Sequence, residues 1–228
     1  DLDAALDMAF AADVDRLKLE RAGVLLQVGV LKRDSAMLDQ AGRDLSALIE
    51  ASAADERPLS RARAVMLAAA GLRALATLAG DIPALAKAEA LTDAAADLFT
   101  PDHAPLDWAA VQLARQAPLA VLQQAEAAVR QPGLILAALV TDRRLAVEID
   151  LATAAGDQTS LRRIRMGLLA RLSAEPRPGP VDWAVLQIGL ARLDDRHSAG
   201  RGLILAEAEL TAREAGAPAL ADRARALV

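Results

Sequence analysis

Apolar residues recur along almost the whole chain at the three- and four-residue spacing of an amphipathic helix. In one segment they stand at Leu17, Val24, Leu25, Val28 and Leu31. A stripe with this period marks the face that a helix buries. Prolines and glycines interrupt the stripe at intervals that suit short helices joined by turns. The pattern therefore predicts an all-α protein with few strands or none.

The interruptions divide the chain into helices that mostly follow one another in pairs. We expect a short first helix near 2–11, followed by eleven others. Their expected ranges are 13–33, 36–53, 59–79, 83–99, 106–116, 118–130, 134–155, 158–174, 181–195, 201–215 and 218–227.

A single helical pair cannot bury its apolar faces alone, so the expected fold is a stack of antiparallel helical hairpins in one domain, 1–228. The segment 173–180 is rich in proline, and it forms either a long loop between hairpins or a weak domain boundary. The approximate hairpin units are 13–53, 58–100, 105–132, 134–174 and 180–216.

Two sequence motifs repeat. Leu-Ala-Thr-Leu-Ala-Gly-Asp at 75–81 returns as Leu-Ala-Thr-Ala-Ala-Gly-Asp at 151–157, an offset of 76 residues. Pro-Leu-Asp-Trp-Ala at 105–109 returns as Pro-Val-Asp-Trp-Ala at 180–184, an offset of 75 residues. Two motifs that return at nearly one period are typical of a stacked repeat architecture.

The Gly-Asp pairs Gly80-Asp81 and Gly156-Asp157 each stand between two predicted helices. Glycine suits the left-handed residue that ends one helix, and aspartate suits the N-cap that begins the next. We interpret both pairs as tight corners. The alternative, a metal-binding or catalytic carboxylate, is not needed to explain the residue types.

The segments Pro105–Gln112 and Pro180–Gln187 share the pattern Pro-x-x-Trp-Ala-x-x-Gln. This pattern resembles a divergent group of bacterial tetratricopeptide repeats (TPRs), in which it opens the first helix of a unit and a Gly-Asp-like corner leads into the second. The resemblance implies a TPR-like α-solenoid, wound as a right-handed superhelix, that binds another protein or a peptide.

Trp108 and Trp183 each precede a glutamine, Gln112 or Gln187, by four residues and so share a helical face with it. We expect both tryptophans to be largely buried between hairpins. Exposed tryptophans that bind a partner are the alternative. The glutamines either line a binding groove or bridge neighbouring helices.

Composition excludes several classes of protein. Hydrophobic residues make up 54% of the chain and aromatic residues only 2%, and there is no cysteine. Disulfides, thiolate metal sites and cysteine nucleophiles are therefore excluded. The longest apolar runs, 64–72 and 133–140, are shorter than the ~20 residues of a membrane span. We expect a soluble chain with no membrane insertion.

Charge is distributed unevenly. The formal net charge is −5, yet residues 134–178 carry 5 acidic and 7 basic residues. This excess is too weak to suggest nucleic-acid binding. The arginines of residues 134–178 form either solvated helix faces or a site for an anion or an acidic peptide. The candidates are Arg143, Arg144, Arg162, Arg163 and Arg165.

No catalytic motif is present, and we expect no catalytic residue, cofactor or metal. A P-loop, Gly-x-Ser-x-Gly and Gly-x-Gly-x-x-Gly are all absent. His103 and His197 fall in predicted loops. His197 follows Asp194 and Asp195, but this group lacks the helix-presented spacing of zinc sites.

The sequence favours a non-enzymatic scaffold or adaptor that binds a protein or peptide. The alternative is a regulatory or sensory domain that binds a small anion or signal peptide in a curved groove. A deep pocket lined by Arg143, Arg162 and Arg165 would favour this alternative. The chain begins at Asp1, and we expect a trimmed or mature product. The sequence does not identify the compartment, although the cytoplasm is favoured over the periplasm. It also leaves open whether the chain forms a homo-oligomer.

Overall fold

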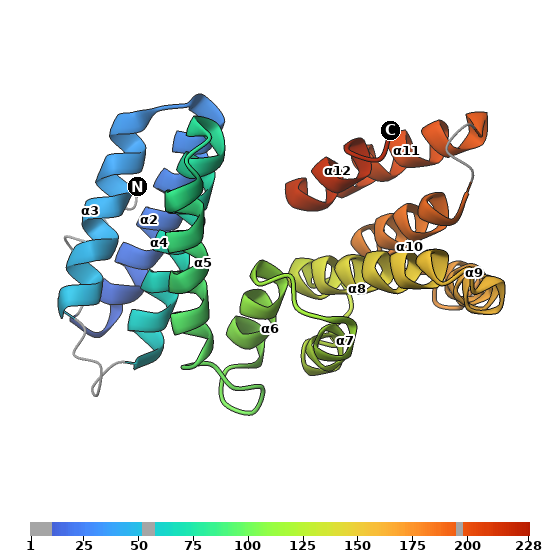
Figure 1. Ribbon diagram of the computed structural model, residues 1–228, viewed down its shortest axis with the longest axis horizontal. Coiled ribbons are helices and arrows are strands. Elements are labelled where there is room, and N and C mark those ends of the chain that lie inside the picture. The colour runs from blue at the N-terminus through green and yellow to red at the C-terminus, as the bar shows by residue number, and fades with distance from the viewer. Residues whose placement is uncertain (1–10, 52–57, 195–197) are drawn as a thin grey trace. The chain divides into compact units, whose positions relative to one another are not determined.

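The computed structural model describes residues 11–51, 58–194 and 198–228 (Figure 1). This described part contains eleven helices and no strand. The helices are α2 (Ala11–Lys32), α3 (Ser35–Ala51), α4 (Pro58–Ala79), α5 (Ile82–Ala96), α6 (Pro105–Ala114), α7 (Leu119–Ala128), α8 (Ile135–Ala154), α9 (Gln158–Leu172), α10 (Pro180–Leu193), α11 (Ala199–Glu214) and α12 (Pro218–Arg225).

The prediction of an all-α protein is confirmed for these residues. Each expected helix from 13–33 onward corresponds to one observed helix. Helices α6, α10 and α12 begin at a proline, which suits the first helical position because its missing N–H would have no partner there. The expected first helix near 2–11 lies, apart from Ala11, outside the described residues.

The chain divides into two compact units, Asp1–Arg115 (unit 1) and Gln116–Val228 (unit 2). The division lies between residues 115 and 116 and not at 173–180. That segment is a loop between α9 and α10 within unit 2. The expected hairpin 105–132 is also divided, because α6 belongs to unit 1 and α7 to unit 2.

Unit 1 is built on the hairpins α2–α3 and α4–α5, and both α2 and α3 pack against α4 (Figure 1). Its core includes Leu26, Leu38 and Leu45, which pack with small alanines such as Ala22 and Ala64. Small side chains let the helix axes approach closely, so the scarcity of aromatic residues does not prevent a packed core.

Two glycines with different surroundings give a matched test of this packing. A Cβ atom on Gly29 would lie 2.9 Å from Cγ of the buried Leu38, whereas a Cβ atom on Gly42 would meet nothing within 4 Å. We expect Gly29→Ala to lower the free energy of unfolding by about 1–2 kcal/mol through overpacking. Gly42→Ala should raise it by about 0.5–1 kcal/mol. Urea denaturation would measure both, and a stabilised Gly29→Ala variant would contradict the α2–α3 packing.

Helix α4 is the one described helix that is long and apolar enough to cross a membrane. Runs of uninterrupted apolar residues do not reveal it, because Arg63 and Arg73 lie within the helix. In the structure α4 packs against α2, α3 and α5. A core helix of a soluble protein meets the same criterion as a membrane span, so length and composition alone do not separate the two.

Unit 2 is organised around α8 and α10. Helix α8 packs against α7, α9, α10 and α12, and α10 packs against α9, α11 and α12 (Figure 1). One core cluster joins them, and its fully buried members include Leu186, Ile188, Leu205 and Leu220. This arrangement fixes the corner between α8 and α9 against the carboxyl end of α10.

The two Gly-Asp corners have matching geometry. Gly80 and Gly156 adopt left-handed backbone angles, with φ of 69° and 65°. Asp81 accepts a hydrogen bond from the Ala84 amide at 3.0 Å, and Asp157 accepts one from the Ser160 amide at 3.0 Å. Both aspartates are therefore N-caps.

The Asp157 cap makes the corner sensitive to acid. Hydrogen bonds from the Ser160 side chain and amide lower the pKa of Asp157 below its ordinary value. Because the folded-state pKa is depressed, the cap's contribution is present above the unfolded pKa and is lost as pH falls through the folded pKa. We expect an NMR titration of the Ser160 amide to show this lowered midpoint, and Asp157→Asn to abolish the transition. A midpoint at or above the usual aspartate value would contradict the cap.

Candidate functional site

The arginines at 143 and 144 do not join those of α9 in one basic stripe. Arg144 contacts Glu126 at 2.7 Å and Glu148 at 2.5 Å. Arg143 donates a long hydrogen bond of 3.5 Å to the side chain of Gln116. This pair therefore lies among partners on α7, on α8 and just before α7.

The three arginines of α9 have different partners. Arg163 contacts the Ser160 hydroxyl at 3.4 Å. Arg165 contacts Asp194 at 2.8 Å and donates to the Leu193 carbonyl at 2.7 Å. Arg162 is exposed and has no hydrogen bond or ion pair with any part of the chain that the structure describes. It is the cation of this group that is available to a ligand.

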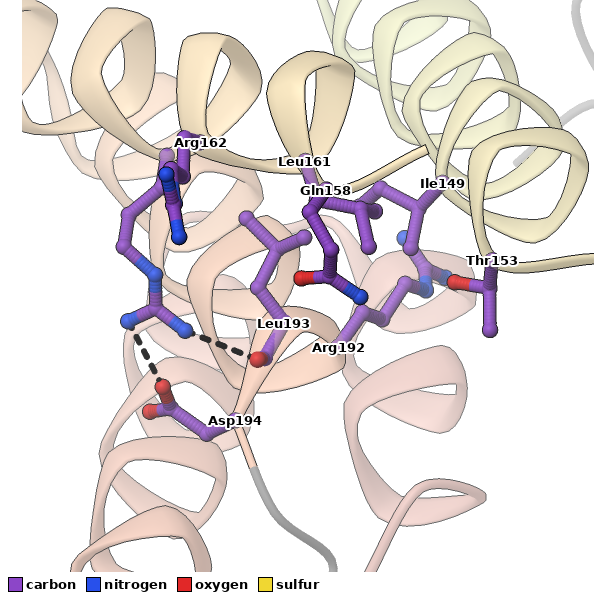
Figure 2. A pocket seen from close by; sticks show the side chains of 9 residues that line it. Ile149, Thr153, Gln158, Leu161, Arg162, Arg192, Leu193 and Asp194 are labelled. Atoms are coloured by element: carbon purple, nitrogen blue, oxygen red, sulfur yellow. Dashed lines mark hydrogen bonds and ion pairs between the residues drawn. The ribbon is translucent and has the colours of Figure 1, made fainter. Parts of the chain in front are cut away.

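A half-open pocket of about 370 Å³ lies where α8, α9 and the end of α10 meet (Figure 2). We call it the α9 pocket. It is lined by Ile149, Thr153, Gln158, Leu161, Arg162, Arg165, Arg192, Leu193 and Asp194. The structure thus brings Arg162 and Arg165 together at one pocket but does not bring Arg143 to it.

The polar groups of the α9 pocket come from different elements. Figure 2 shows the Gln158 amide reaching from α9 into the space between Arg162 and Thr153. Arg165 and Arg192 supply two further positive charges, and Asp194 supplies one negative charge, which is already paired with Arg165. The lining therefore has an excess of positive charge.

A buried aspartate binds one of the arginines that line the pocket. Asp142 is 1% exposed, and its two carboxylate oxygens accept hydrogen bonds from Arg192 at 2.5 Å and from Arg223 at 2.7 Å. Arg223 also donates to the Leu139 carbonyl at 3.1 Å. This triad of Asp142, Arg192 and Arg223 ties α8 to α10 and α12.

The sequence analysis does not single out Asp142 and misses the triad. A signal was present, because Asp142 shares the helical face of Leu145 and Ile149, both of which are buried. A charged residue on an apolar face is rarely fully buried unless it is paired. The identity of the pairing arginines carries no comparable signal, since they lie some fifty and eighty residues away.

The repeated aspartates of the Pro-x-Asp-Trp motif also have structural partners that the sequence did not indicate. Asp107 binds Arg63 of α4 through two hydrogen bonds, of 3.0 and 2.6 Å, and this hydrogen bonding raises the pKa of Arg63. Asp182 accepts from the Gly133 amide, just before α8, at 3.2 Å. In each unit the motif thus reaches back to the preceding hairpin.

The repeated tryptophans and glutamines do not line the α9 pocket. Trp108 and Trp183 are partly buried, and each packs against the core of its own unit. Gln112 is buried and Gln187 is half-buried.

A second pocket of about 410 Å³ lies beside α7, α8 and the end of α9. Its arginines are Arg130, Arg144 and Arg171, but Glu126 and Asp182 also line it. The two carboxylates nearly balance the three guanidinium groups, so this pocket has a smaller positive excess than the α9 pocket.

The structure describes one of the two histidines, His103. His103 lies 3.0 Å from the Thr100 hydroxyl. His197 and Asp195 lie outside the described residues. Within residues 11–51, 58–194 and 198–228, no group of three or more histidine, aspartate or glutamate side chains is placed to hold a metal ion.

Comparison with known proteins finds no matching family model, no matching curated protein and no matching solved structure. The resemblance to TPRs accordingly rests on the residue patterns alone, and any function must be argued from the geometry of this chain.

Proposed function

We propose that this chain is a TPR-like, non-enzymatic helical-repeat protein that binds a protein or peptide partner. The packing order supports a repeat in both units. In unit 1 the first hairpin's helices α2 and α3 both pack on α4, and in unit 2 α8 and α9 both pack on α10. Stacked hairpins of this kind form an α-solenoid, which offers a continuous binding surface.

The observation that carries the proposal is the cationic α9 pocket in the less acidic unit. Unit 1 contains 18 acidic and 12 basic residues, a net charge of −6, whereas unit 2 contains 13 acidic and 14 basic residues, a net charge of +1. Arg162 and Arg165 therefore stand in the part of the chain that repels an acidic segment least. We propose that the partner presents such a segment.

Selection of displayed peptides on the full chain tests this function. We expect enrichment of acidic peptides, with binding that weakens as salt rises, because exposed charges are screened beyond a Debye length of roughly 8 Å at physiological ionic strength. Reversal of both charges, Arg162→Glu with Arg165→Glu, should lower the association rate more than the thermal stability. Equal affinities for wild type and variant at low and high salt would exclude these arginines from the binding surface.

The second candidate is a regulatory domain that binds a small anion. The volume of the α9 pocket, about 370 Å³, favours it, since small-molecule sites occupy roughly 300–1,000 Å³. The half-open shape favours a partner's side chain instead, because small-molecule sites usually enclose most of the ligand's surface. The two candidates differ in whether free acids or peptides bind more tightly.

A further inference from the structure

We propose that the α9 pocket binds one oxyanionic group, a carboxylate or a phosphate, carried on a short apolar stem. The inference rests on the proposed function, because it names the chemical group that the binding site of that function takes.

The first argument concerns unused hydrogen-bond donors. Arg162 has no partner among the described residues. Arg192 uses only its Nη1 atom on Asp142, which leaves Nε and Nη2 without a partner among the described residues. A guanidinium group offers its donors in a planar fork that matches the oxygens of a carboxylate or phosphate. Two arginines with free donors at one pocket therefore suit an oxyanion.

The second argument concerns the fixed conformation of the Arg192 side chain. The Arg192 side chain is only 14% exposed, and its position is fixed by the buried carboxylate of Asp142. A side chain that is already held in place loses little conformational entropy when a ligand arrives. Arg192 is thus an ordered, mostly buried part of the pocket lining, whereas Arg162 is exposed.

The third argument concerns the apolar lining. Ile149, Leu161 and Leu193 line the same pocket as the arginines. Its volume of about 370 Å³ equals that of roughly a dozen water molecules at about 30 Å³ each. A bare oxyanion would leave most of this space unfilled, and the leucines would stay exposed to water. An oxyanion with a stem of a few carbon atoms would cover them.

Asp194 gives the proposal its sharpest test, because its negative charge repels an oxyanion in the pocket. It pairs with Arg165 at 2.8 Å and places a negative charge on the pocket lining. Asp194→Asn should release Arg165 and remove this repulsion, so oxyanions should bind several-fold more tightly. A gain in affinity cannot result from a misfolded variant.

The experiment uses the full chain and follows the backbone amides of Gln158 and Thr153 by heteronuclear NMR. The probes are inorganic phosphate, phenyl phosphate, isovalerate and the uncharged isovaleramide. We expect saturable shifts with phenyl phosphate and isovalerate, weaker binding of inorganic phosphate, and the weakest binding of isovaleramide. Arg162→Gln should weaken phenyl phosphate binding about tenfold, since it removes charge-assisted hydrogen bonds. Arg163→Gln is the matched control, because Arg163 does not line the pocket.

N-acetyl-Leu-Glu amide distinguishes the source of the oxyanion. Tighter binding of this peptide than of isovalerate supports a polypeptide side chain in the pocket, and the reverse order supports a free small acid. Absence of saturable shifts with every charged probe, equal effects of Arg162→Gln and Arg163→Gln, or weaker binding by Asp194→Asn would each overturn the inference. If acidic peptides are nevertheless selected and bind elsewhere, the proposed function stands without this site.

Discussion

Replacement of Asp142 by alanine is expected to lower the free energy of unfolding of unit 2 by about 3–5 kcal/mol, the range for breaking a buried ion pair by removing one partner. Asp142 is 1% exposed and forms ion pairs with two guanidinium groups. Without it, Arg192 and Arg223 would face each other with no carboxylate between them. The ion pairs that join α8 to α10 and to α12 would both be lost.

Each unit contains one tryptophan, which makes this change measurable by fluorescence. In a Trp108→Phe background, Trp183 alone reports the unfolding of unit 2 in urea. Asp150→Ala is the matched control, because Asp150 is exposed on the same helix and should change stability by less than about 0.5 kcal/mol. An Asp142→Ala variant as stable as the control would show that the triad does not stabilise unit 2.

Replacement of Trp183 by alanine is expected to cost about 2 kcal/mol. A fully buried tryptophan or phenylalanine costs about 3–5 kcal/mol on truncation, and Trp183 is only half-buried against the core of unit 2. Leu203→Ala on α11 is the control, since Leu203 is 76% exposed. Thermal unfolding followed by circular dichroism would compare the two. A Trp183→Ala variant no less stable than Leu203→Ala would indicate that Trp183 is available to a partner.

Local features of the fold could be predicted from the sequence because their causes are local. The prolines that begin α6, α10 and α12 act on their own helix, and the left-handed Gly80 and Gly156 require no distant residue. The corner after α2 lacks the glycine that marks the other two corners, because Arg33, a non-glycine residue, takes the left-handed conformation there with φ of 53°. The Asp34 cap that follows it is still evident.

The division into units and the composition of the site depend on distant residues. Nothing in the local pattern separates α6 from α7, since both lie within one regular run of turns and apolar positions. Arg192 belongs to the α9 pocket only because α10 packs against both α8 and α9, so the charge pattern of residues 134–178 does not reveal it. Burial of Asp142 likewise follows from the approach of α12.

Photocrosslinking tests partner binding at the α9 pocket most directly. A photoreactive residue replaces Gln158 on the pocket or, as a control, the exposed Glu89 of α5 in unit 1, and each full chain is irradiated in an extract of the cells that make the protein. We expect a polypeptide adduct at position 158 that excess acidic peptide from the selection suppresses, and no matching adduct at position 89. The absence of any polypeptide adduct at 158, or the same adducts at both positions, would contradict the account.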